Sequence, residues 1–214
     1  MWIGLALCAL ALVVLFLAEA RQRAPIAAAA KVVASASFLL AALIEGAADT
    51  LGGQALLIAL VWSALGDLLL IPRDNRVTFL FGMVAFAIAH VGYAFVFHLR
   101  GVDALGVGLG AAIAGAAGLA FFLWLRPHVR QRAPGMIAPV LGYLAVITLM
   151  VSMGAGAFAR APDAAWLGLV AAVVFWLSDV TVAMVRFAGG RRLWRLVGLP
   201  LYYAAQFLFV ATLR

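Results

Sequence analysis

Four ionisable side chains lie inside long apolar stretches of the sequence, where charge is costly. They are Lys31, Asp67, His90 and Asp179. A charged side chain at membrane depth costs about 2.5–3.5 kcal/mol on insertion scales, and such residues usually mark functional positions. Two carboxyl groups in a low-dielectric pocket divide naturally into an acid and a base, because burial and mutual repulsion favour the protonated form of one of them. We therefore expect Asp67 and Asp179 to perform acid–base chemistry, with Lys31 and His90 beside them.

Other polar side chains accompany these four and are candidates for binding a substrate. Ser178 directly precedes Asp179, and Ser63 lies about one helical turn before Asp67. The remaining candidates are Tyr93, Tyr202, Tyr203, Gln206 and, at the end of an apolar stretch, Glu19.

Several of these residues also have structural explanations that the sequence leaves open. Lys31 could pair with Asp67 inside a bundle, or its long side chain could extend to the lipid headgroups. His90 lies among aromatic residues and could be a hydrogen-bonded core histidine. The adjacent Tyr202 and Tyr203 have the amphipathic character of aromatic residues at a membrane interface.

Familiar catalytic and metal-binding motifs are absent from the sequence. It contains no GxSxG elbow, HExxH motif, cysteine cluster or Walker loop. Of the three histidines, His98 and His128 lie in or beside predicted loops, and the lone Cys8 excludes an internal disulfide. We therefore expect neither a metal site nor a cofactor, which leaves carboxylate chemistry.

The composition is that of a membrane protein. Of the 214 residues, 68% are hydrophobic and 11% are charged, whereas soluble domains average about 45–50% apolar and about 25% charged residues. Apolar stretches recur that are long enough to cross a hydrocarbon core of roughly 30 Å. We predict a single all-α transmembrane domain over residues 1–214, with eight spans at about 2–18, 26–44, 54–71, 77–98, 102–125, 135–153, 163–186 and 195–213.

The distribution of arginines predicts the orientation of these spans. The loops after the first, third, fifth and seventh spans carry eleven arginines, and the opposite side carries three. Basic residues collect in cytoplasmic loops, so we expect both termini to lie outside. The same loops account for the net charge of +7, and we expect no nucleic-acid partner. Arginine makes up fourteen of the fifteen basic residues, a bias typical of GC-rich bacterial genomes, which suggests the bacterial inner membrane.

The rise of a helix predicts that the polar groups lie at similar depth. At about 1.5 Å per residue, Lys31, Asp67, Asp179 and the tyrosine pair fall in one slab roughly 10 Å thick, with His90 near the midplane. We therefore expect polar groups from five spans to meet at one interior site.

Small residues form one face of the span predicted at 102–125. Gly106, Gly110, Ala114 and Gly118 recur at every fourth position. Such a face lets two helix backbones approach closely. We expect it to pack within the chain, with a homodimer through this face as the alternative.

The polar residues occur in runs that resemble those of the YhhN family of integral membrane proteins. Residues 63–70 (SALGDLLL) and 81–93 (FGMVAFAIAHVGY) carry the Gly-Asp pair and the histidine of that family. Residues 175–179 (FWLSD) are similar to its late Ser-Asp motif, residues 202–206 (YYAAQ) to its last helix, and Lys31 to an early lysine. The resemblance covers nearly the whole chain in order.

This resemblance implies a lysoplasmalogenase, which hydrolyses the vinyl ether bond of lysoplasmalogen to a fatty aldehyde and a glycerophospho-alcohol. A lysophospholipid and membrane lipids would then be its partners. In that chemistry we expect Asp179 to act as the acid and Asp67 as the base. His90 or the tyrosines would orient water or the glycerol hydroxyl, and loop arginines such as Arg73, Arg76 and Arg191 are candidates for holding the phosphate.

Two other classes of function use the same kind of residues. Intramembrane Asp, Lys and His also form proton relays, so a small proton-coupled transporter or exporter is the main alternative. A non-catalytic lipid-binding or assembly protein is the third hypothesis. A flux assay separates the transporter from the hydrolase, and product analysis separates the hydrolase from the binding protein.

Overall fold

The computed structural model describes residues 1–72, 75–190 and 192–214, with the side chain of Arg192 left out. Within these residues the chain forms eight long α-helices and one short 3-10 helix, and no strand occurs. The elements are α1 (Trp2–Ala20), α2 (Ala24–Ile44), α3 (Leu51–Leu69), α4 (Arg76–Leu99), α5 (Ala104–Arg132), η1 (Pro134–Met136), α6 (Ile137–Arg160), α7 (Pro162–Phe187) and α8 (Arg192–Ala211).

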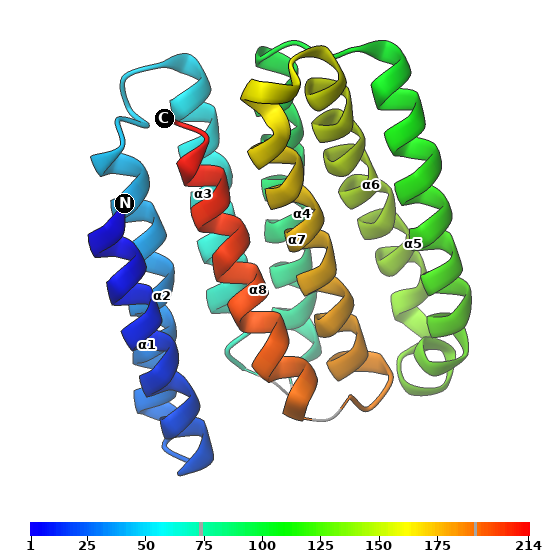
Figure 1. The fold of residues 1–214 in the computed structure, drawn as a ribbon. Coiled ribbons are helices and arrows are strands. Elements are labelled where there is room, and N and C mark those ends of the chain that lie inside the picture. Colours follow the sequence, from blue (N-terminus) through cyan, green and yellow to red (C-terminus); the bar gives the residue numbers. More distant parts are fainter. Residues whose placement is uncertain (73–74, 191) are drawn as a thin grey trace.

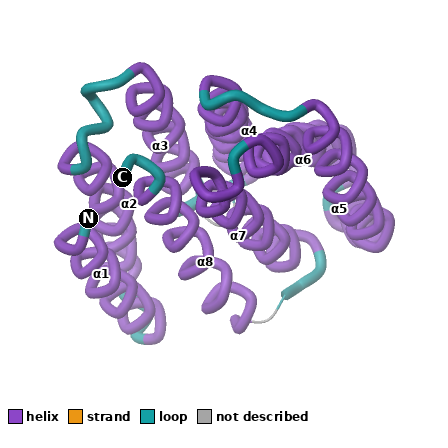
Figure 2. Tube along the Cα trace, turned by 45° about the horizontal axis from the view of Figure 1, so that its top comes forward, coloured by secondary structure: helices purple, strands orange, loops and turns teal. Residues whose placement is uncertain are grey.

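The eight helices pack as four hairpins of consecutive helices. The closest pairs are α1 with α2, α3 with α4, α5 with α6, and α7 with α8. Contacts of α2 with α8, α4 with α6, and α6 with α7 join these hairpins into one bundle (Figure 1). Helices α1 and α5 lie at opposite edges of it (Figure 2).

All eight helices are long and apolar enough to cross a membrane, which confirms the predicted number of spans. Their outward faces carry many exposed apolar side chains, for example Leu10 on α1 and Ile113 on α5. A soluble protein rarely exposes so much contiguous apolar surface, whereas a bilayer accommodates it.

Two helices extend well beyond their predicted ends. Helix α5 continues through Pro127 to Arg132, where the sequence predicted a loop. The extension buries Val129 in a small core with Phe79 and Phe187, so tertiary packing outweighs the lost backbone hydrogen bond at the proline. Helix α6 runs on to Arg160 because its last turns pack closely against the start of α5.

The small-residue face of α5 lies against α6. A Cβ atom added at Gly106 would lie 2.5 Å from Cβ of Ala159, and one at Gly110 would lie 2.6 Å from Cβ of Ala155. This face is therefore used for packing within the chain, as expected. A homodimer through the same face would require α6 to move away, so we do not propose it.

One charge cluster fixes the end of the bundle where both termini lie. Arg214 donates from Nε and Nη2 to the Glu45 carboxylate at 2.8 and 2.9 Å, and the Met1 amino group donates to it at 2.6 Å. The hydrogen bonds from Arg214 are the main reason that the pKa of Glu45 falls from 4.5 to about 2. Eight helices join the two termini, so the connections after α1, α3, α5 and α7 lie at the opposite end of the bundle. These are the connections for which the sequence predicts most arginines.

Candidate active site

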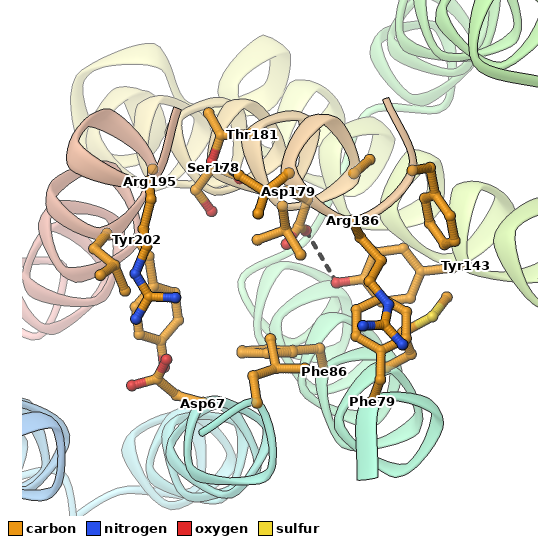
Figure 3. A pocket seen from close by; sticks show the side chains of 18 of the residues that line it. Asp67, Phe79, Phe86, Tyr143, Ser178, Asp179, Thr181, Arg186, Arg195 and Tyr202 are labelled. Carbon is orange, nitrogen blue, oxygen red and sulfur yellow. Dashed lines mark hydrogen bonds between the residues drawn. The ribbon is translucent and has the colours of Figure 1, made fainter. Parts of the chain in front are cut away.

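A cavity of about 450 Å³ lies between six of the eight helices. Its walls come from α2, α3, α4, α6, α7 and α8, and Asp67 and Asp179 reach it from different sides (Figure 3). Arg186 and Arg195 line it at the end of the bundle that carries the arginine-rich loops. The two predicted carboxyl groups therefore share one cavity below that end.

Lys31 and Asp67 form a buried ion pair on one wall. Lys31 Nζ lies 2.9 Å from Asp67 Oδ1 and donates to the Asp67 backbone carbonyl at 2.7 Å. Ser35 and Tyr203 donate their hydroxyls to Oδ2 at 2.9 and 2.7 Å. Lys31 is only 5% exposed, so its side chain points inward and does not extend to the headgroups. One cation and two hydroxyl donors thus surround the Asp67 carboxyl group.

A glycine beside Asp67 explains how α3 places this carboxylate. A Cβ atom added at Gly66 would lie 2.8 Å from the Phe86 ring of α4, closer than real Cβ contacts allow. On α4, a Cβ at Gly82 would lie 3.3 Å from the Gly66 carbonyl oxygen. These two glycines let α3 and α4 approach closely. Asp67 and Phe86 line the cavity from these two helices.

Asp179 has a different environment on the opposite wall. The Tyr143 hydroxyl donates to its Oδ2 at 3.0 Å, and His90 Nε2 lies 3.3 Å from the same oxygen. His90 Nδ1 is 2.5 Å from the Phe86 carbonyl oxygen, which can only accept, so Nδ1 carries a hydrogen. His90 Nε2 is buried, has no hydrogen-bond partner among the described residues, and lies beside the Asp179 carboxyl group. His90 and Tyr143 thus approach the same oxygen of Asp179.

Three of the predicted substrate-binding residues lie behind the cavity. The Tyr93 hydroxyl donates to Gln206 Oε1 at 2.5 Å and lies 3.1 Å from Ser63 Oγ. Tyr202 connects this network to the cavity, which it lines, by donating to the Ser63 carbonyl at 2.9 Å. Ser63, Tyr93 and Gln206 are buried and are not among the residues that line the cavity.

The other predicted residues are placed as follows. Ser178 lines the cavity, although its hydroxyl donates to the Phe175 carbonyl at 2.7 Å within α7. Tyr203 reaches the site through Asp67. Glu19 lies outside the lining and accepts a hydrogen bond of 3.0 Å from Arg195, which does line it.

Sequence reasoning missed Ser35, Tyr143 and Arg195. A signal for Tyr143 existed, because it occurs within an apolar span and not at its end. The chain has four tyrosines, and all four belong to the hydrogen-bond networks described above. Ser35 and Arg195 resemble ordinary helix and loop residues, and only the packing of α2, α3 and α8 brings them to the site.

The phosphate-binding candidates and possible metal ligands complete the survey. Arg73 and Arg191 lie outside the described residues, and Arg76 is exposed and does not line the cavity. Among the described residues, no three His, Cys, Asp or Glu side chains gather into a group suited to a metal ion.

The chain is similar to known proteins over most of its length. The model of the YhhN family matches residues 26–213. Lysoplasmalogenase TMEM86B of Mus musculus is 33% identical over 71% of this chain and 60% of its own length. Human lysoplasmalogenase TMEM86A is 33% identical over 71% of this chain and 61% of its own length.

Human TMEM86B, also a lysoplasmalogenase, is 37% identical over 70% of this chain and 59% of its own length. The matched part thus spans about three fifths of these curated relatives. No solved structure matches the chain. The family model extends over all the site helices, from Lys31 on α2 to Tyr203 on α8, and this chain belongs to the YhhN family.

Proposed function

We propose that this protein hydrolyses the vinyl ether bond of lysoplasmalogens, releasing a fatty aldehyde and a glycerophospho-alcohol. The relatives named above are lysoplasmalogenases. One observation carries the proposal: two carboxyl groups with different basic neighbours, Lys31 and His90, line one membrane cavity. Such a pair supplies both an acid and an ionised carboxylate near neutral pH.

Vinyl ether hydrolysis begins with a proton transfer to carbon. The proton adds to the alkene carbon farther from oxygen, and the positive charge spreads over the other carbon and the ether oxygen. Water then attacks this oxocarbenium carbon and loses a proton, which gives a hemiacetal. The hemiacetal then collapses: its hydroxyl group loses a proton, the ether oxygen gains one, and the bond between the carbon and the ether oxygen breaks. This releases the aldehyde and the glycerol hydroxyl.

The two carboxyl groups fit the two halves of this reaction. Asp179 supplies the proton to carbon, because it lines the cavity and Tyr143 fixes the orientation of its carboxyl group. Asp67, which is paired with Lys31, stabilises the oxocarbenium charge across the cavity. Asp67 also accepts a proton from the attacking water and passes it to the ether oxygen as the hemiacetal collapses, while the proton of the hemiacetal hydroxyl returns to Asp179. General acid–base catalysis of this kind contributes about 10²–10⁴-fold to the rate.

The headgroup of the substrate fits the arginine-rich end of the cavity. Arg186 and Arg195 line this end, and Glu19 holds the Arg195 guanidinium in place. A guanidinium matches the geometry of a phosphate group. The ether bond lies a glycerol unit below the phosphate, so a phosphate at Arg195 places the vinyl ether deeper in the membrane, towards the carboxyl groups.

Replacing Arg195 with glutamine is expected to raise KM by roughly tenfold or more, because one charge-assisted contact worth about 1.5–3 kcal/mol is lost. The value of kcat should change much less, since Arg195 does not touch the reacting carbon. Steady-state kinetics with a lysoplasmalogen measure both constants. Arg130→Gln is the matched control, because Arg130 is exposed at the same end of the bundle and does not line the cavity. Equal effects in the two variants would contradict the headgroup site.

Replacing Tyr143 with phenylalanine is expected to lower kcat by about 10–100-fold, which corresponds to a lost hydrogen bond of about 1.5–3 kcal/mol to a charged group. The Tyr143 hydroxyl donates to Asp179, and without it the carboxyl group rotates and loses its orientation. The measurement is kcat with its pH profile. An unchanged kcat and an unchanged profile would show that Tyr143 does not position the acid.

The activity itself is tested by product analysis with the purified protein in detergent. Aldehyde and glycerophospho-alcohol should appear in equal amounts from choline or ethanolamine lysoplasmalogen. The saturated alkyl ether analogue is the control, because it has no alkene to protonate and should stay intact. Cleavage of both lipids, or of neither, would contradict the proposal. A proton-coupled transporter, the main alternative from the sequence, gains no support from the named relatives.

We infer that the arginine-rich end of the bundle faces the cytoplasm. The sequence assigns eleven arginines to the segments in and beside the connections predicted for this side and three to the other side, which supports that orientation. The substrate then enters from the cytoplasmic leaflet, which in a bacterium is that of the inner membrane. Labelling of single cysteines placed in the loops on either side tests this orientation.

A further inference from the structure

A second, smaller cavity of about 70 Å³ adjoins the first between α5, α6 and α7. Val140, Tyr143, Asp179 and Ala183 line both cavities. The residues that line the smaller one alone are glycine, aliphatic or aromatic: Gly118, Phe121, Phe122, Leu125, Leu144, Ile147, Trp176 and Val180. Asp179 therefore lies at the junction of a mixed polar cavity and an apolar one.

The two cavities extend in different directions from Asp179. On α7, Arg186 lies about two turns towards the arginine-rich end, whereas Trp176 lies about one turn in the opposite direction. On α6, Ile147 lies about one turn deeper than Tyr143. The apolar cavity thus continues from the junction towards the centre of the membrane and towards α5.

We propose that this apolar cavity binds the first methylene groups of the alkenyl chain of the substrate. The inference rests on the proposed function, because the vinyl ether is the junction between an apolar chain and a polar glycerophosphate. A lipid with its phosphate at Arg195 and its chain between α5, α6 and α7 has its vinyl ether at Asp179. Apolar walls favour the chain there, because its methylene groups are removed from water and need no polar partner.

Gly118 lines the apolar cavity where α5 packs against Leu144 of α6. A Cβ atom added at Gly118 would clash with Leu144 Cδ1, so a larger side chain displaces Leu144 and changes the wall of the cavity. Gly118→Leu therefore alters the cavity from α5. Gly108→Leu is the matched control on the same helix, because no atom of the described residues outside its own helix lies within 4 Å of a Cβ built there.

Photo-crosslinking tests the location of the chain independently of turnover. The probe is an alkyl lysophosphatidylethanolamine with a diazirine near the headgroup end of its chain, added to the full-length protein in detergent. We expect crosslinked peptides to come from α5, α6 and α7, around Phe121, Leu144 and Trp176. Gly118→Leu should lower this crosslinking by roughly tenfold, as expected when a few methylene groups lose their pocket, and Gly108→Leu should not. Melting temperatures identify any variant that fails to fold.

The outcomes separate this inference from the proposed function. Crosslinks of the wild-type protein confined to α2, α3 and α8 would overturn the inference, whatever the activity. Crosslinks on α5, α6 and α7 without aldehyde release from lysoplasmalogen would support the chain site and contradict the vinyl ether hydrolase. Aldehyde release with an equal loss of crosslinking in both glycine variants would show that the apolar cavity does not hold the chain.

Discussion

Replacing Asp179 with asparagine is expected to lower kcat for vinyl ether hydrolysis by about 10²–10⁴-fold, the usual contribution of a general acid. Asparagine keeps the size of the side chain and still accepts a hydrogen bond from Tyr143, so KM and the melting temperature should stay close to the wild-type values. It cannot give a proton to carbon, which is the step that starts the reaction.

Asp163→Asn is the control for the loss of one carboxylate from the same helix. Asp163 is exposed in the first turn of α7, far from the cavity, and its variant should keep wild-type kinetics. If Asp179→Asn retains more than about a tenth of the wild-type kcat, the acid contributes less than acid catalysis normally does. His90 or a bound water would then be the proton donor.

Replacing Asp67 with asparagine is expected to remove activity and to destabilise the fold together. The change leaves the Lys31 ammonium buried without its carboxylate, and breaking a buried ion pair in this way costs about 3–5 kcal/mol. The melting temperature in detergent should therefore fall clearly, unlike that of Asp179→Asn.

The double variant Lys31→Met with Asp67→Asn separates the two roles of this aspartate. Replacing both partners removes the uncompensated charge, so most of the lost melting temperature should return. Activity should remain absent, because no carboxylate is left to stabilise the oxocarbenium ion. Recovery of both stability and activity would show that the Lys31–Asp67 pair is structural only.

Depth was the part of the site that the sequence could predict. Span ends and the fixed rise of a helix placed Lys31, Asp67 and Asp179 at similar levels, and the structure brings all three to the same cavity. A pairing of Lys31 with Asp67 was one of the structural alternatives that the sequence left open, and the two side chains do form an ion pair.

The direction in which each side chain faces could not be predicted in the same way. Tyr93 and His90 lie one turn apart on α4, yet His90 approaches Asp179 and Tyr93 belongs to the network behind the cavity. That difference depends on the rotation of α4 against its neighbours. Rotation is set by packing details such as the Gly66–Phe86 contact, which no hydrophobic pattern specifies.

The sequence pattern could not predict where α5 ends. Pro127 and the charges around it indicate a loop, and a proline inside a helix normally removes one backbone hydrogen bond. The helix continues because Val129 is buried against residues from α4 and α7, which are distant in the chain. Tertiary burial thus decided a boundary that local propensity places elsewhere.

Isotope labelling during hydrolysis tests most directly the claim that this protein protonates the vinyl ether carbon. The reaction is run on lysoplasmalogen in D2O and, separately, in water labelled with oxygen-18, and both products are analysed by mass spectrometry. The account predicts one deuterium on the aldehyde carbon next to the carbonyl group, and no oxygen-18 in the glycerol hydroxyl that is released. Oxygen-18 in that hydroxyl would show that the bond between glycerol and the ether oxygen is cleaved instead, and it would contradict the acid role of Asp179.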